Sequence, residues 1–157
     1  MRVRAHMVAL GIGLVLVVLA GTPSAQRATT PPPTVDIVST VGCAVKVPGT
    51  PPTWTLTRAA DPAVSPDPFA SPEAVDEART QPLGSRSFPL VGVAEYLTDE
   101  DRQELSVAGN QVVGFQRAST GQLRDGHHVA VRGLLVEVNG EQRINLTSVV
   151  SLDETCG

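Results

Sequence analysis

The side chains with the widest chemical repertoire in this sequence are histidines and cysteines, and both types are scarce. His127 and His128 are adjacent, and an imidazole can bind a metal ion or transfer a proton. Because neighbouring residues of a strand point to opposite faces, the pair cannot easily share one ion. Asp125 could complete a site with one of them, but the ligand spacing of a known metal motif is missing. We interpret the pair as one turn residue and one strand residue, with a metal-binding protein as the alternative.

No signature of a known catalytic mechanism accompanies the histidines. The chain has no G-x-S-x-G motif for a serine nucleophile and no G-x-x-x-x-G-K-[ST] loop for a phosphate group. Asp99, Glu100, Asp101 and Glu104 form an acidic cluster that matches neither a calcium loop nor a buried acid/base pair. Acids are favoured at the start of a helix, so a solvated helix start explains the cluster. The sequence predicts no enzyme and no cofactor, and an enzyme of unknown type is the alternative.

The N-terminal residues have the pattern of a secretory signal peptide. Arg2 and Arg4 precede an apolar stretch over residues 7–20, and small residues follow up to Ala25. A charged start, a short apolar core and a small-residue cleavage region are typical of exported proteins. We expect residues 1–25 to be removed, with cleavage after Ser24 or a retained anchor as alternatives. The protein is then secreted or periplasmic and meets a membrane only during export.

Charge and hydropathy exclude further classes of protein. The 157-residue chain has a formal net charge of -4, which becomes -6 when residues 1–25, with two arginines and no acid, are removed. Nucleic-acid-binding proteins normally have a basic surface, so the composition argues against a nucleic-acid partner. No apolar run reaches the roughly 18 residues of a membrane-spanning helix, which argues against a multi-span membrane protein.

Cys43 and Cys156 are the only cysteines, and export would place them where disulfides persist. A bridge between them would close nearly the whole domain and could contribute roughly 4 to 5 kcal/mol by the loop-entropy model. The chain has no C-x-x-C motif, so redox catalysis has little support. We predict a structural disulfide, and two free thiols or a metal-binding pair are the alternatives.

Composition divides the rest of the chain into a tether and one domain. Residues 26–34 are polar and contain three consecutive prolines, which predicts a disordered Pro-rich tether. Residues 35–157 form the predicted domain, and residues 61–87, with five of the 13 prolines, form an excursion within it. Ser71 and Pro72 suit the N-cap and first position of a short helix in this excursion. A surface excursion is the favoured interpretation, and a binding loop is the alternative.

Strand patterns dominate the domain. Apolar residues alternate along residues 35–47, with a kink expected at Gly42. Asn139-Gly140 separates two apolar-rich segments and is the pair that best tolerates a type I′ hairpin turn. The predicted strands are residues 35–47, 53–57, 88–93, 111–116, 128–138 and 141–152, and a second short helix, capped by Thr98, covers residues 98–105.

A two-residue turn fixes which residues of the hairpin face each other. The expected pairs are Leu135 with Ile144, Gly133 with Leu146 and Val129 with Val150. These residues make one apolar face, as a core surface should be. The other face carries the polar residues Arg132, Arg143, Asn145 and Thr147 beside apolar ones, which makes it the candidate binding face. An ordinary solvated face with cross-strand pairs is the alternative.

Several of these segments together resemble a family. They are V-G-C at residues 41–43, W-T-L-T-R-A at 54–59, F-P-L-V-G-V at 88–93, G-H-H-V-A-V-R-G-L-L-V at 126–136, R-I-N-L-T-S-V at 143–149 and the cysteine at 156. The set is similar to small exported bacterial proteins of unknown function with an OB-like β-barrel. This resemblance implies a mainly β fold, a small five-stranded, partly closed barrel with one or two short helices, and a terminal disulfide. It implies no known activity.

The observations favour an exported, non-enzymatic binding or interaction module with an unknown ligand or protein partner. An OB-type oligonucleotide or oligosaccharide binder is the second hypothesis, since OB barrels bind such polymers through aromatic platforms and cationic grooves. The acidic charge opposes a polyanion, and the aromatic residues are few: Trp54, Phe69, Phe88, Tyr96 and Phe115. A metal-binding protein or an enzyme is the third hypothesis.

Overall fold

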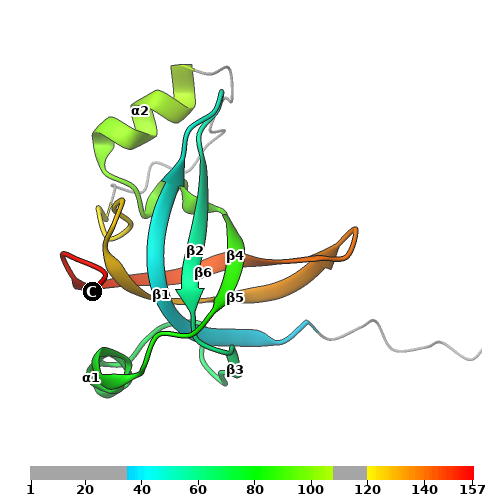
Figure 1. Ribbon diagram of the computed structural model, residues 1–157, viewed down its shortest axis with the longest axis vertical. Coiled ribbons are helices and arrows are strands. Elements are labelled where there is room, and N and C mark those ends of the chain that lie inside the picture. The colour runs from blue at the N-terminus through cyan, green and yellow to red at the C-terminus, as the bar shows by residue number, and fades with distance from the viewer. Residues whose placement is uncertain (1–34, 108–119) are drawn as a thin grey trace, which may run out of the picture. The chain divides into compact units, whose positions relative to one another are not determined.

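The computed structural model describes residues 35–107 and 120–157 (Figure 1). The elements are β1 (Ile37–Val47), β2 (Thr53–Ala59), β3 (Ala63–Val64), α1 (Pro72–Thr80), β4 (Arg86–Val91), a 3₁₀ turn (Val93–Glu95), α2 (Asp99–Val107), β5 (His128–Val138) and β6 (Glu141–Asp153). The prediction of a mainly β fold with two short helices is confirmed. The predictions for residues 1–25, 26–34 and 111–116 lie outside the described residues.

Five strands form a ring in the order β1, β2, β4, β6, β5 and back to β1. All neighbours in the ring are antiparallel except β4 and β6, which are parallel and pair only at Leu90–Ile144 and Val91–Asn145. β1 closes the ring because residues 37–43 pair with β5 and residues 43–47 pair with β2. The ring is therefore uneven, with long ladders on most sides and one short parallel contact.

Gly42 lies where β1 passes from β5 to β2. A Cβ atom at this position would lie 2.7 Å from Cγ of Leu56 and 2.9 Å from the carbonyl oxygen of Thr57. A glycine in a strand interior commonly marks such a close approach of two segments. The absence of a side chain thus lets the first strand lie against the second and serve two neighbours.

The β5–β6 hairpin confirms most of the predicted register. Asn139 and Gly140 both have positive φ, as a type I′ turn requires, and Leu135–Ile144 and Gly133–Leu146 face each other. The third pair was wrong: Val129 faces Ser151 rather than Val150. The register shifts by one residue between Gly133–Leu146 and Arg132–Ser148, which leaves Thr147 as an extra residue, a β-bulge.

The bulge decides which valine enters the main core. Val149 pairs with Val131, and both lie in the buried cluster inside the ring, whereas Val150 packs on the cluster outside it. The inner cluster is centred on Trp54, Leu56, Phe88, Leu97, Leu123, Val129 and Ile144. The outer cluster is smaller and joins α1 to the outer face of the sheet through Val41, Ala60, Ala78, Ala130 and Leu152.

Both helices begin where the sequence predicted. Ser71 is the N-cap of α1, its hydroxyl accepts a hydrogen bond from the backbone N–H of Ala74, and Pro72 is the first helical residue. Thr98 caps α2 by accepting from the N–H of Asp101. The two helices lie at opposite ends of the ring in Figure 1. These caps satisfy backbone donors that a helix start leaves without partners.

The excursion and the strand after it differ from the prediction. Residues 63–64 form the short strand β3, which pairs with β1, and β4 begins at Arg86 rather than Phe88. β4 ends at Val91 rather than Val93, because Gly92 has a φ of 76° and turns the chain into the 3₁₀ turn. A left-handed residue cannot continue a strand, and glycine adopts this conformation without steric cost.

Candidate functional site

The two cysteines are joined in the structure. Cys43 and Cys156 form a disulfide with a Cα–Cα distance of 5.5 Å and a sequence separation of 113 residues. The backbone N–H of Cys156 also donates to the carbonyl of Gly126 at 2.9 Å. The bridge therefore fastens the C-terminal residues to β1, and neither thiol is left for a metal or for redox chemistry.

The four residues of the candidate binding face lie on the outer side of the β5–β6 ladder, but they separate into two pairs. Arg132 and Thr147 both bind the backbone of residues Asp67–Phe69, which we call the Phe69 loop. Arg143 pairs across the ladder with Val136, and Asn145 lies between Leu134 and Val91. Within the described residues, the Nε atom of Arg143 is buried without a hydrogen-bond partner. That this face binds a ligand stays a prediction.

The Phe69 loop is held at three successive carbonyls. The Arg132 guanidinium donates to the carbonyl of Asp67 at 3.1 Å and to that of Phe69, and the Thr147 hydroxyl donates to the carbonyl of Pro68 at 2.9 Å. The Ser65 hydroxyl also donates to the carbonyl of Asp67 at 2.9 Å. Two of the predicted ligand contacts therefore position part of the excursion.

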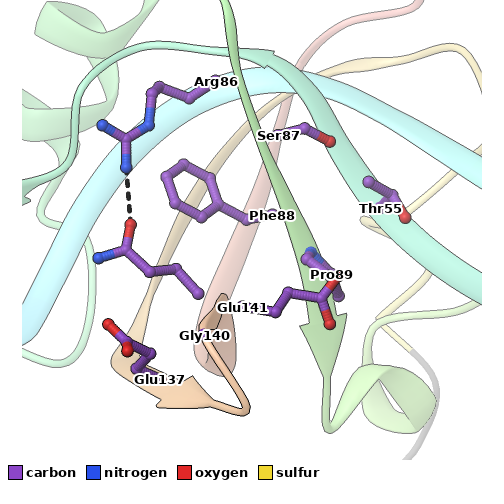
Figure 2. Close-up of a pocket in the computed structure, with 9 residues that line it drawn as sticks. Thr55, Arg86, Ser87, Phe88, Pro89, Glu137, Gly140 and Glu141 are labelled. Atoms are coloured by element: carbon purple, nitrogen blue, oxygen red, sulfur yellow. Dashed lines mark hydrogen bonds between the residues drawn. The ribbon is translucent and has the colours of Figure 1, made fainter.

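A groove lies on the other side of the short β4–β6 contact (Figure 2). N-terminal to their two paired positions, these parallel strands have no register with each other, and the groove follows this opening. We call it the seam groove. It is lined by Thr55 of β2, by Arg86, Ser87, Phe88 and Pro89 of β4, and by Glu137, Gly140, Glu141 and Gln142 of the hairpin. Its volume is about 550 Å³, and it is open to solvent along its length.

Arg86 crosses the wide end of the seam groove. Its guanidinium donates to Oε1 of Gln142 at 2.6 Å, lies 3.5 Å from a carboxylate oxygen of Asp61 and stands 5.4 Å from the centre of the Phe88 ring. Figure 2 shows the Arg86–Gln142 bond joining β4 to the hairpin. This cation is therefore already occupied by groups of the protein itself.

The remaining charges of the groove are negative. Glu137 and Glu141 flank the hairpin turn, both are exposed, and neither forms an ion pair within the described residues. Hydroxyl groups of Thr55 and Ser87 complete the polar lining, and the Phe88 ring is only 1% exposed. The arrangement can accept hydrogen bonds and attract cations, and it offers no exposed aromatic ring.

The two histidines occupy structural positions. Nδ1 of His127 lies 3.1 Å from the Ser151 hydroxyl, and Nδ1 of His128 lies 3.3 Å from a carboxylate oxygen of Asp153. His128 is buried, and its Nε2 has no hydrogen-bond partner in the described part of the chain. Across residues 35–107 and 120–157, no three His, Cys, Asp or Glu side chains gather as metal ligands.

The acidic cluster of α2 has a partner that sequence reasoning missed. The Lys46 ammonium donates to Asp101 at 2.8 Å and also to Glu104. The hydrogen bonds from Asp101 and then Glu104 raise the pKa of Lys46 above its usual value. Half of the cluster thus fastens α2 to the end of β1, although the acids are 55 and 58 residues from the lysine.

The seam groove was also missed, but one signal pointed to it. Pro89 lies in a strand, and a proline in a sheet is confined to edges, strand starts and bulges because it lacks an N–H donor. Pro89 therefore indicates that β4 has an unpaired stretch. The length of the hairpin beyond Ile144 gave no comparable sign, because polar and apolar residues alternate there as in any exposed ribbon.

None of the helices in the described residues is long and apolar enough to span a membrane. No family model, curated protein or solved structure matches the chain. The site is therefore interpreted from its own geometry.

Proposed function

We propose that this protein is an exported, non-enzymatic binding module with an OB-like barrel, and that its seam groove binds an extended polar ligand that carries positive charge. The proposal depends mainly on the place of the groove. OB folds are five-stranded, partly open barrels that bind ligands on the face of strands 2 and 3 and at the loops joining strands 1–2 and 4–5. In this ring those elements are β2, β4 and the β5–β6 turn, which line the groove.

Export is supported by two independent features. The predicted leader over residues 1–25 would direct the chain out of the cytoplasm. The Cys43–Cys156 disulfide is typical of an oxidising compartment such as the periplasm or the cell exterior. Both features suit a protein that is secreted or periplasmic.

The chemistry of the groove favours a cationic ligand. Glu137 and Glu141 are exposed carboxylates, whereas Arg86 is bonded to Gln142 and lies near Asp61. Binding of single-stranded nucleic acid normally uses a positive groove and stacking aromatic rings. The groove has two acids, and Phe88 is covered, so an oligonucleotide is the disfavoured ligand.

The test compares short peptides on the exported, oxidised protein by amide chemical-shift mapping. A lysine-rich peptide should shift the amides of Ser87, Glu137, Glu141 and Gln142, and a glutamate-rich peptide of equal length and oligothymidine should not. Glu137→Gln with Glu141→Gln should weaken binding about tenfold, because two charge contacts are lost. The matched control is Glu77→Gln with Glu154→Gln, which removes two exposed acids outside the groove.

Three results would contradict the proposal. Oligothymidine could bind more tightly than the basic peptide, with the steep salt dependence of a polyanion. The control pair could weaken peptide binding as much as the groove pair does. The lysine-rich peptide could also leave the groove amides unshifted.

A further inference from the structure

Phe69 is an exposed aromatic side chain on an immobilised backbone. Its ring is 67% exposed, whereas Trp54 and Phe88 are 1% exposed and Tyr96 is 6% exposed. Among the aromatic residues of the described chain, Phe69 alone is presented to solvent. An apolar ring of this size favours burial, so its exposure leaves a contact surface that a partner could cover.

The loop that carries Phe69 is fixed by side chains of the sheet. Arg132 and Thr147 bind the carbonyls of residues 67, 68 and 69, and Ser65 binds the first of these again. These bonds join segments that are 63 to 79 residues apart in the sequence. A ring whose backbone is held in advance loses less conformational freedom when a ligand covers it.

A depression of about 260 Å³ lies beside the Phe69 ring. Tyr96 and Val149, both nearly buried, contribute to it, and hydroxyl groups come from Thr120, Thr147 and Ser148. Sites that enclose a drug-sized ligand usually measure 300–1,000 Å³. A ligand would therefore lie across this depression, with one part on the ring and its polar groups at the hydroxyls.

We propose that the Phe69 depression binds a neutral oligosaccharide, with one sugar ring stacked on Phe69. A pyranose has an apolar C–H face, which suits an aromatic face, and hydroxyl groups at its edge, which suit side chains that both donate and accept hydrogen bonds. The Ser148 hydroxyl is such a group, since the described structure gives it no hydrogen bond.

The charges around the depression favour a neutral ligand over an anionic one. No Lys or Arg side chain lines it, and the nearby Arg132 guanidinium is bonded to the Asp67 and Phe69 carbonyls. Polyanions such as nucleic acids are normally bound with several cationic side chains along the backbone. Stacking on Phe69 without such cations suits an uncharged sugar.

The experiment titrates the exported, oxidised protein with four neutral tetrasaccharides: chitotetraose, cellotetraose, maltotetraose and laminaritetraose. At least one should shift the amides of Phe69, Thr147 and Ser148. Phe69→Ala should weaken its binding at least tenfold, and Phe69→Tyr, which keeps the ring, should retain most of the affinity. The matched control is Val64→Ala, because Val64 is 71% exposed and lies on β3, outside the depression.

The inference is overturned if none of the four sugars binds up to about 10 mM, which is weaker than about -3 kcal/mol. It is also overturned if Phe69→Ala leaves the affinity unchanged, if Val64→Ala lowers it equally, or if oligothymidine displaces the sugar. The acid-to-amide pair at Glu137 and Glu141 should leave sugar binding intact, because the seam groove shares no residue with this depression. Failure of one site is therefore distinguishable from failure of the other.

Discussion

The two ends of β5 belong to regions that are closed in different ways. At its start, the disulfide joins Cys43 to Cys156, and backbone bonds run from Ala44 to His127 at 3.0 Å and from Gly126 to Ala44 at 2.9 Å. At its end, the hairpin extends past the ring, and β4 and β6 meet at two positions only. Figure 1 shows the C-terminus and the hairpin tip on opposite sides.

The difference separates stability from access. Covalent closure and dense backbone pairing restrict the disulfide end, whereas the seam end leaves strand edges, carboxylates and hydroxyls open to solvent. Binding elements commonly come from regions with few buried contacts, because those regions can open at low free-energy cost. We expect substitutions at the disulfide end to lower the free energy of unfolding and substitutions at the seam to change binding.

The largest effect is expected from removing the disulfide. Cys43→Ser with Cys156→Ser should lower the free energy of unfolding by up to about 4 to 5 kcal/mol, because the bridge closes a loop of more than 100 residues. Urea denaturation measures the loss, and the unmodified protein under reducing conditions is the control. A loss below about 1 kcal/mol would show that backbone contacts alone hold this end.

The next effect concerns Gly133, where β5 and β6 approach closely. A Cβ there would lie 2.2 Å from the carbonyl oxygen of Asn145 and 2.7 Å from Cγ2 of Ile144. Gly133→Ala should lower the free energy of unfolding by about 2 to 3 kcal/mol, because the backbone must move apart. Gly157→Ala, with open space around its Cβ, should change nothing measurable in the same denaturation assay. Equal stability of the two variants would contradict this account of the crossing.

A smaller effect is expected from Arg132→Ala, which removes two bonds to the Phe69 loop. The free energy of unfolding should fall by about 1 kcal/mol, and amide hydrogen exchange at residues 67–70 should accelerate. Arg143→Ala on the same face is the control, since its side chain forms no hydrogen bond with the described residues. Unchanged exchange at the loop in Arg132→Ala would show that other contacts hold it.

The smallest effect is expected at Lys46. Lys46→Gln should cost about 0.5 to 1 kcal/mol, because the ion pairs with Asp101 and Glu104 are partly exposed to solvent. The folded state raises the pKa of Lys46, so this contribution is fully present below pH 10.5 and is lost as pH rises through the folded pKa. Denaturation of both proteins at neutral pH and above pH 10.5 measures it. A gap that widens with rising pH would contradict the assigned sign.

Local patterns predicted the elements well, because their causes lie close together in the chain. Asn139-Gly140 specified the turn, and Ser71 and Thr98 specified two helix starts. The register beyond Leu146 was wrong because Val149 and Val150 are adjacent valines, and a period of two cannot decide which of them faces inward.

The site was harder to predict than the fold. The residue types of Arg132 and Thr147 suggested ligand contacts, but their partners are carbonyls of a loop 63 to 79 residues away. The seam groove depends on where β4 and β6 stop pairing, which follows from the closure of the whole ring. Neither fact is encoded within a short window of sequence.

The bulge at Thr147 makes the length of β6, rather than its composition, decide which residues meet the core. Without the extra residue, strict alternation would resume, and Val150 would replace Val149 opposite Val131. Deleting one residue there would exchange the surroundings of every position from Ser148 to Ser151. No single substitution in the strand can produce that rearrangement.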